Sequence, residues 1–135
     1  MAPPVTETPC HTIAPNVLDF FHEALARRRH QGIVPRTALV RDEEGQVAGF
    51  RLTVSGGIVQ DVEYRATTCA TLVGLCEHAA QLVAGNSIGE VARINAGSLL
   101  ALHSEIPTSR RNRALLVERA ITAALYKTEH WRRGQ

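Results

Sequence analysis

The sequence predicts a small α+β domain, in which a mostly antiparallel three-stranded sheet is covered on one face by C-terminal helices. Strand-like segments come first along the chain and helical segments follow, an order typical of α+β folds. A hairpin signal at Ser55-Gly56-Gly57 joins two segments in which apolar and polar residues alternate, so the two strands are expected to pair antiparallel. Two later segments carry apolar stripes at helical spacing, which gives each helix one face to bury against the sheet.

The length and composition favour one soluble domain. A chain of 135 residues fits a single domain, and apolar and charged fractions of 44% and 21% are ordinary for a globular protein. We expect residues 1–14 to be a flexible lead, residues 15–127 the domain and residues 128–135 a C-terminal tail. The net charge of +2 argues against a strong field for nucleic acid or membrane. With no signal peptide or membrane span visible, a cytoplasmic location is expected.

The first half of the chain is expected to contain one helix and the three strands. The helix begins near Pro15-Asn16 and ends around Arg27 to Arg29, before Gly32 and Pro35. The strand-like segments are residues 37–41, 47–55 and 58–66.

The second half is expected to be helical. Thr67-Thr68 precedes a long helix from Cys69 to about Ala84, and Gly85-Asn86 closes it. Two short helical pieces follow, at residues 87–90 and 95–103. The last helix carries an apolar stripe over residues 114–125 and is expected to end near Lys127.

Three segments, taken in order and spacing, match a known family pattern. They are a central hairpin (residues 50–54 with 57–62), a strand that delivers Cys69 to the head of a helix (64–69), and a loop with a last helix (106–107 with 118–121). In these features the chain resembles the IscU and NifU N-terminal scaffold family of iron–sulfur cluster assembly. SufE-type sulfur acceptors share this fold. The resemblance implies an IscU/SufE-like sheet and a role in cluster assembly or sulfur transfer.

The same resemblance implies a degenerate metal site. Cys69 falls on the second cysteine of the family, whereas its first cysteine aligns with Glu44-Gly45-Gln46 and its His-Cys pair with Asn112-Arg113. A conventional [2Fe–2S] cluster, normally held by four ligands, is therefore not expected. Glu44 or Gln46 could leave one oxygen ligand opposite Cys69, and Asp42 and Glu43 are as acidic as Glu44, so a shift of this loop would change which of them points inward. No cofactor is assigned, and iron, zinc or a labile iron–sulfur cluster is left open.

Cys69 is the candidate reactive, persulfide-accepting thiol. A helix N-terminus favours the thiolate and so lowers the pKa of a cysteine placed there. The resemblance brings the start of the last helix nearby, so Arg110, Arg111 or Arg113 could add positive charge. With Asn112 these residues are expected to flank the site or to face a partner. The alternative is that Cys69 is a small buried residue between strand and helix.

The remaining thiols and imidazoles have less specific interpretations. Cys76 lies two helical turns after Cys69 within an apolar stripe, which predicts a core position. His78 is expected to be solvated and His103 to cap a short helix. Cys10 and His11 are adjacent in the lead, where no pattern of further ligands lies within reach. We expect them to be disordered, and metal capture is the weaker alternative.

Two function hypotheses of different class follow. The first is a scaffold-like or sulfur-accepting protein of iron–sulfur assembly, not an enzyme, which acts through Cys69 with a cysteine desulfurase or another assembly protein. The second is a non-catalytic interaction or regulatory module that kept the fold and lost metal binding. A homodimer is open under both hypotheses, and neither nucleic acid nor membrane is an expected partner.

Overall fold

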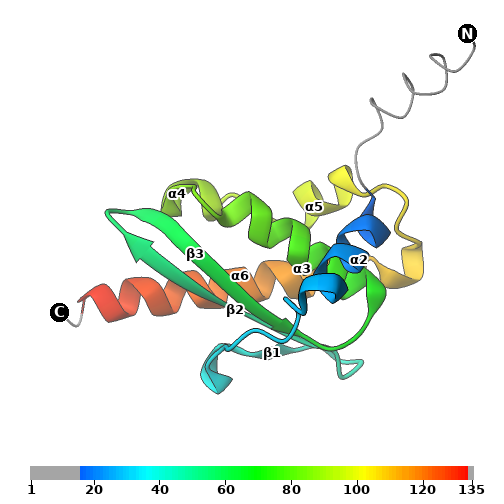
Figure 1. The fold of residues 1–135 in the computed structure, drawn as a ribbon, viewed down its shortest axis with the longest axis horizontal. Helices are drawn as coiled ribbons and strands as arrows, with labels where there is room; N and C mark the ends of the chain where they lie inside the picture. Colours follow the sequence, from blue (N-terminus) through cyan, green and yellow to red (C-terminus); the bar gives the residue numbers. More distant parts are fainter. Residues whose placement is uncertain (1–15, 134–135) are drawn as a thin grey trace, which may run out of the picture.

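The computed structural model describes residues 16–133 as one sheet packed against helices (Figure 1). The sheet has three strands, and two long helices lie along it. The elements run in the order α2 (Val17–Arg27), 3₁₀ turn η1 (Arg36–Ala38), β1 (Val40–Arg41), β2 (Val47–Ser55), β3 (Ile58–Ala66), α3 (Ala70–Val83), α4 (Ile88–Val91), α5 (Ala96–Leu102), 3₁₀ turn η2 (Thr108–Arg110) and α6 (Asn112–Arg133).

The sheet is an antiparallel meander in the order β1-β2-β3. Strands β2 and β3 pair along their whole length, with Phe50 opposite Tyr64, and a bulge interrupts the register between Thr53 and Val54. Gly56 and Gly57 form the connecting turn with φ of +60° and +79°, a backbone conformation that suits glycine and matches the twist of a tight hairpin. The predicted hairpin is confirmed.

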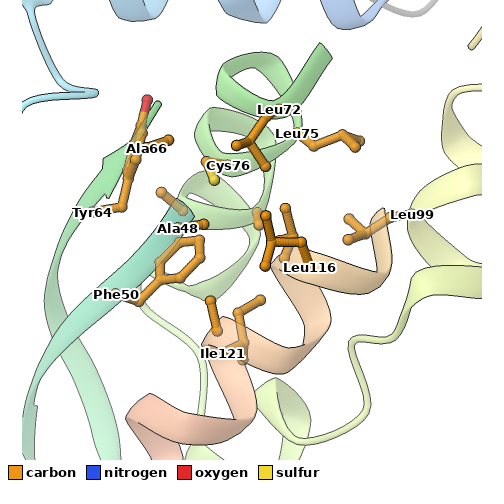
Figure 2. Close-up of a cluster of buried hydrophobic side chains, with 14 of the residues drawn as sticks. Ala48, Phe50, Tyr64, Ala66, Leu72, Leu75, Cys76, Leu99, Leu116 and Ile121 are labelled. Atoms are coloured by element: carbon orange, nitrogen blue, oxygen red, sulfur yellow. The ribbon is translucent and has the colours of Figure 1, made fainter. Parts of the chain in front are cut away.

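One face of the sheet is covered by α3 and α6, as the apolar stripes predict (Figure 2). Phe50 and Tyr64 project from β2 and β3 towards these helices, and each is 1% exposed. They meet buried side chains of α3, α5 and α6, among them Leu72, Leu75, Cys76, Leu99, Leu116 and Ile121. Each large apolar side chain buried here stabilises the fold by about 1.5–3 kcal/mol. The predicted α+β fold is thereby confirmed.

Helix α2 packs across α3 and is held at both ends. Asn16 and Asp19 form a reciprocal capping box at its start, and Arg28 ends it in a left-handed conformation with φ of 54°. Just beyond that end, Arg29 Nε donates to the buried Glu77 of α3 at 2.9 Å. Tyr64 also donates to Glu77, at 2.7 Å, so one carboxylate ties the end of α2 to both α3 and the sheet.

Two predicted elements differ from the structure. The segment from residue 37 to 41 is a 3₁₀ turn followed by a strand of only two residues, because Ala38 N–H bonds back to Pro35 C=O and curls the chain. The last helix runs on to Arg133 instead of ending near Lys127, since nothing between these residues breaks a helix. Within the described residues no helix combines the length and apolarity needed to cross a bilayer. Cys10 and His11 lie outside the described residues.

Candidate functional site

Cys69 lies where β3 passes into α3 and is itself the N-cap of that helix. Thr67 and Thr68, which precede it, do not cap the helix. Thr67 Oγ1 is committed elsewhere, since it donates to Gln46 Oε1 at 2.7 Å and accepts from the Val47 N–H. The thiol is only 7% exposed, but it sits at the positive end of a 14-residue helix.

Two guanidinium groups from the start of the last helix lie against this sulfur. Arg113 Nε is 3.5 Å and Arg110 Nη1 is 3.6 Å from Cys69 Sγ. Arg110 ends η2 and Arg113 lies in the first turn of α6, three residues later, so both side chains reach the same side. Arg111 between them is exposed and makes no contact with the thiol among the described residues. The sequence placed all three arginines near the site, and the structure selects the outer two.

Glu44 also enters this site, but as the partner of an arginine. Its Oε1 accepts from Arg113 Nη1 at 2.6 Å, and its Oε2 accepts from Asn112 Nδ2 at 3.3 Å. Asn112 Oδ1 accepts from the same Arg113 nitrogen at 3.0 Å. In this structure the Arg113 guanidinium lies between Glu44 and Cys69 and joins the two groups.

The sequence indicated Asp42 only as a turn residue and as an alternative acidic group at this site, and the structure gives it a further part. Its Oδ1 accepts from the N–H groups of Glu44 and Gln46, each at 2.9 Å, and so shapes the turn that presents Glu44. Its Oδ2 is buried without a hydrogen bond and lies 3.9 Å from Arg113 Nη1. Asp42 thus adds a second negative charge behind Arg113. The signal in the sequence is an acidic turn at the position where the family pattern carries its first cysteine.

The surroundings of Cys69 favour its thiolate on balance. Burial raises the pKa of the thiol. Four effects together outweigh burial and hold the pKa below its ordinary value: the hydrogen bond from Arg113, the Leu72 N–H, the charge of Arg113 and the Thr71 N–H. The effect is mutual, since the hydrogen bond to Cys69 is the largest cause that raises the pKa of Arg113.

The donor set does not fit an iron–sulfur cluster or a single metal ion. The Cys69 thiol and the carboxylates of Glu44 and Asp42 lie around the Arg113 guanidinium, which already binds Cys69 and Glu44. A tetrahedral site needs about four donors, and a bound cation would compete with Arg113 for the same lone pairs. Among the described residues, no group of three or more Cys, His, Asp or Glu side chains is arranged to hold a metal ion.

Cys76 lies in the core, as predicted. It is fully buried in α3, and burial, followed by the charges of Glu77 and Cys69, raises the pKa of its thiol far above the ordinary value. A protonated, inaccessible thiol is a poor nucleophile. Of the two cysteines in the described part of the chain, Cys69 alone is suited to react.

His78 and His103 form a paired cluster, not the solvated residue and simple cap that the sequence suggested. His78 stacks on Phe20 with ring centroids 4.2 Å apart, and its Nδ1 lies 2.6 Å from His103 Nε2. Burial, and then the charge of His103, lower the pKa of His78. His103 does follow the last residue of α5, but its side chain is fully buried and its Nδ1 lies 3.2 Å from Glu105 Oε2. The sequence missed this cluster because His78 pairs with a residue 25 positions away.

Comparison with known proteins supports the family resemblance. A family model described as NifU-like N terminal domain matches residues 15–133, which is most of the chain. The match includes Cys69, the acidic turn around Glu44 and the arginines at the start of α6. A search of curated proteins finds no match to the chain.

Proposed function

The chain belongs to the NifU-like N-terminal domain family, whose general role is in iron–sulfur cluster assembly, and from that premise we propose that it accepts sulfane sulfur on Cys69. In this proposal the protein is a carrier that is consumed and regenerated, not an enzyme. Its donor is a cysteine desulfurase or another assembly protein that carries a persulfide.

The observation that carries the proposal is the contact of Cys69 Sγ with two guanidinium groups at a helix N-terminus. The Arg113 and Arg110 nitrogens lie 3.5 and 3.6 Å from the sulfur. Positive groups and N–H donors stabilise a thiolate, and the thiolate is the form that attacks a disulfide or persulfide sulfur. A thiol that merely fills space at the end of a strand needs no such surroundings.

The transfer step balances without an external oxidant or reductant. The Cys69 thiolate attacks the terminal sulfur of the donor persulfide, and a new S–S bond forms at Cys69 as the donor S–S bond breaks. The electron pair of the broken bond leaves on the donor cysteine, which becomes a thiolate. The proton stays on the transferred sulfur or exchanges with water. Arg110 and Arg113 can then stabilise the negative charge of the new persulfide.

The exposed face beside Cys69 suits the approach of a donor protein. Arg111 and Asn112 are exposed next to the thiol, while Arg113 is buried behind them. We propose that the partner docks on this basic face. We also propose a cytoplasmic location, because a carrier thiol stays reduced in the cytoplasm. A homodimer is compatible with this scheme, but the step needs only one chain.

The proposal is tested by the reactivity of Cys69 as a function of pH. The measurement uses the full chain with Cys10→Ser and Cys76→Ala, so that alkylation reports one thiol. Arg113→Met should raise the pKa of Cys69 and slow its alkylation at neutral pH several-fold, because the hydrogen bond and the charge are both lost. Arg111→Met removes one arginine of the same helix end without touching the thiol and should leave the rate unchanged.

Sulfur transfer itself is then followed with radiolabelled cysteine and a purified cysteine desulfurase. Label should appear on the chain and disappear on reduction with dithiothreitol, and Cys69→Ser should abolish it. Arg113→Lys keeps the charge and separates a loss of electrostatics from a loss of folding. A folded protein whose Cys69 neither alkylates nor takes up label would overturn the proposal.

One observation favours the second hypothesis, a module that binds partners without chemistry. Cys69 is 7% exposed, and Glu44 neutralises the arginine beside it. In that case Cys69→Ser would leave the binding of an assembly partner intact, whereas reversing the charge of the exposed Arg111 would weaken it.

A further inference from the structure

An apolar groove lies between the sheet and the C-terminal half of α6, away from Cys69. Its volume is about 880 Å³. The main lining residues are Phe50, Leu52 and Val54 of β2 with Ala123 and Ala124 of α6. Arg113 and Ala123 are ten residues apart on one helix, which separates the groove from the thiol by roughly 15 Å along the axis. The groove is therefore a separate feature from the candidate sulfur site.

The same groove borders a strand edge that lacks a partner. Strand β1 pairs with β2 only through Val40 with Ala48 and Arg41 with Val47. Beyond Ala48, no strand in the described part of the chain pairs with this edge of β2.

The backbone groups that face this edge can be identified from the ladder. Tyr64 accepts from Gly32 N–H and Ala66 donates to His30 C=O, so both turn their backbone groups away from β2. In an antiparallel pair, two residues opposite each other either both bond across the pair or both turn their N–H and C=O groups away from it. Phe50 lies opposite Tyr64, and Leu52 lies opposite Val62. Val54 lies opposite Val59, whose N–H and C=O groups bond to Asn86 and Gly85 and so turn away from β2 as well. Leu52 and Val54 thus direct their N–H and C=O groups to the open edge, whereas the backbone of Phe50 is covered, since that residue is 1% exposed. Unpaired backbone groups beside apolar pockets are what an added strand requires.

The charge of the lining indicates the chemistry of the occupant. Of the residues whose side chains are described, Arg51 and Lys127 line the groove and no carboxylate does. Arg51 already pairs with Glu63 at 2.9 Å, whereas Lys127 is exposed and has no ion pair among the side chains that the structure describes. A carboxylate is the natural partner of Lys127.

We propose that this groove binds an extended peptide segment of a partner protein, which adds to the open edge of β2 as a strand. Its alternate side chains are apolar and enter the groove, and a carboxylate at one end meets Lys127. The N-terminal lead of the chain itself is a less suitable occupant. Helix α2 starts at Val17, whose N–H is bound by Glu105, at the opposite end of the molecule from the C-terminal half of α6 (Figure 1).

The test uses a fluorescent hexapeptide of alternating valine and threonine that carries one glutamate, made with the glutamate at either end. Binding to the full chain should protect the amide protons of Leu52 and Val54 from hydrogen exchange. Ala123→Trp fills the groove and should weaken binding about tenfold or more, which is about 1.4 kcal/mol. Thr122→Trp places the same bulk on an exposed position of α6 outside the lining and should leave affinity unchanged. Lys127→Glu should weaken the binding of this peptide and strengthen the binding of a peptide that carries lysine in place of the glutamate.

Three results would overturn the proposal. The first is no binding, or binding that leaves the amide protons of Leu52 and Val54 exchanging as before. The second is protection of those amides in the free protein that is lost when residues 1–15 are removed, which would assign the groove to the chain's own lead. The third is a dimer that Ala123→Trp dissociates and Thr122→Trp does not, which would assign it to a second copy.

Discussion

At the scale of single residues, Arg113 decides what the site can do. Its guanidinium binds the Cys69 thiol and the Glu44 carboxylate, and it lies 3.9 Å from Asp42 Oδ2, which has no hydrogen bond. The Arg113 guanidinium thus contacts the same sulfur and oxygen atoms that a metal ion would need as ligands. The thiol is stabilised as an anion, the form that attacks a sulfur atom and also the form that ligates a metal, but the further donors that a cluster needs are not arranged around it among the described residues.

A substitution at Glu44 tests how the charges of this site combine. Glu44→Gln removes the negative charge that pairs with Arg113, while Asn112 Oδ1 still accepts from the same Arg113 nitrogen. The pKa of Cys69 should fall further, because the full positive charge of Arg113 then acts on the thiolate. The measurement is the pH dependence of alkylation in the chain whose other cysteines are replaced.

The matched control is Glu43→Gln, which removes the same charge from an exposed neighbour with no contact to Arg113 among the described residues. It should leave the alkylation profile unchanged. A rise in the pKa of Cys69 after Glu44→Gln would contradict the expected sign. It would mean that Glu44 acts mainly by aiming the guanidinium at the sulfur.

The residues of this site could be predicted in part. Placement of Cys69 at a helix head follows from a strand pattern that gives way to a helical one, and the structure agrees. Which arginine contacts the sulfur could not be deduced, because a shift of one residue at the start of α6 would have turned Arg111 inward. The contact between Glu44 and Arg113 spans 69 positions and depends on how the Asp42 turn folds, which local patterns do not report.

At the scale of elements, the crossing of α2 over α3 depends on a glycine inside a helix. A Cβ built at Gly74 would come within 2.2 Å of the Val17 carbonyl oxygen, closer than real side chains approach. Glycine costs a helix interior about 1 kcal/mol relative to alanine, so its presence here is explained by the close approach of the two helices. The sequence predicted both helices, but the isolated Gly74 gave no sign of which helix would cross there.

Gly74→Ala should therefore destabilise the protein despite its better helix propensity. The expected loss is about 1–3 kcal/mol in the free energy of unfolding, because either α2 moves away or the helix backbone distorts. Urea unfolding measures it. Gly89→Ala is the control, since its Cβ would meet only Ser87 Oγ at an ordinary 3.9 Å, and it should be neutral or slightly stabilising. Equal effects of the two substitutions would show that α2 does not pack against α3 at this distance.

At the scale of the whole molecule, the two described cysteines impose opposite dependences of stability on pH. The folded state lowers the pKa of Cys69, so this thiol contributes stability that is present above its unfolded pKa and is lost as the pH falls through its folded pKa. The folded state raises the pKa of Cys76. That contribution is complete below the unfolded pKa and is lost as the pH rises above it.

The alkaline side of the stability profile isolates Cys76. Above the unfolded thiol pKa of about 8.5, the unfolded chain releases the Cys76 proton while the folded chain keeps it, so the free energy of unfolding should fall by about 1.4 kcal/mol per pH unit. Cys76→Ala should remove that slope between roughly pH 9 and pH 10, whatever it does to stability at neutral pH. Cys69→Ala is the matched control, because the Cys69 thiol is ionised in both states over this range and its loss leaves the slope unchanged. Urea unfolding at closely spaced pH values measures both slopes. A slope that survives Cys76→Ala would place the titrating group elsewhere, and Tyr64, whose pKa burial also raises, would be the next residue to replace.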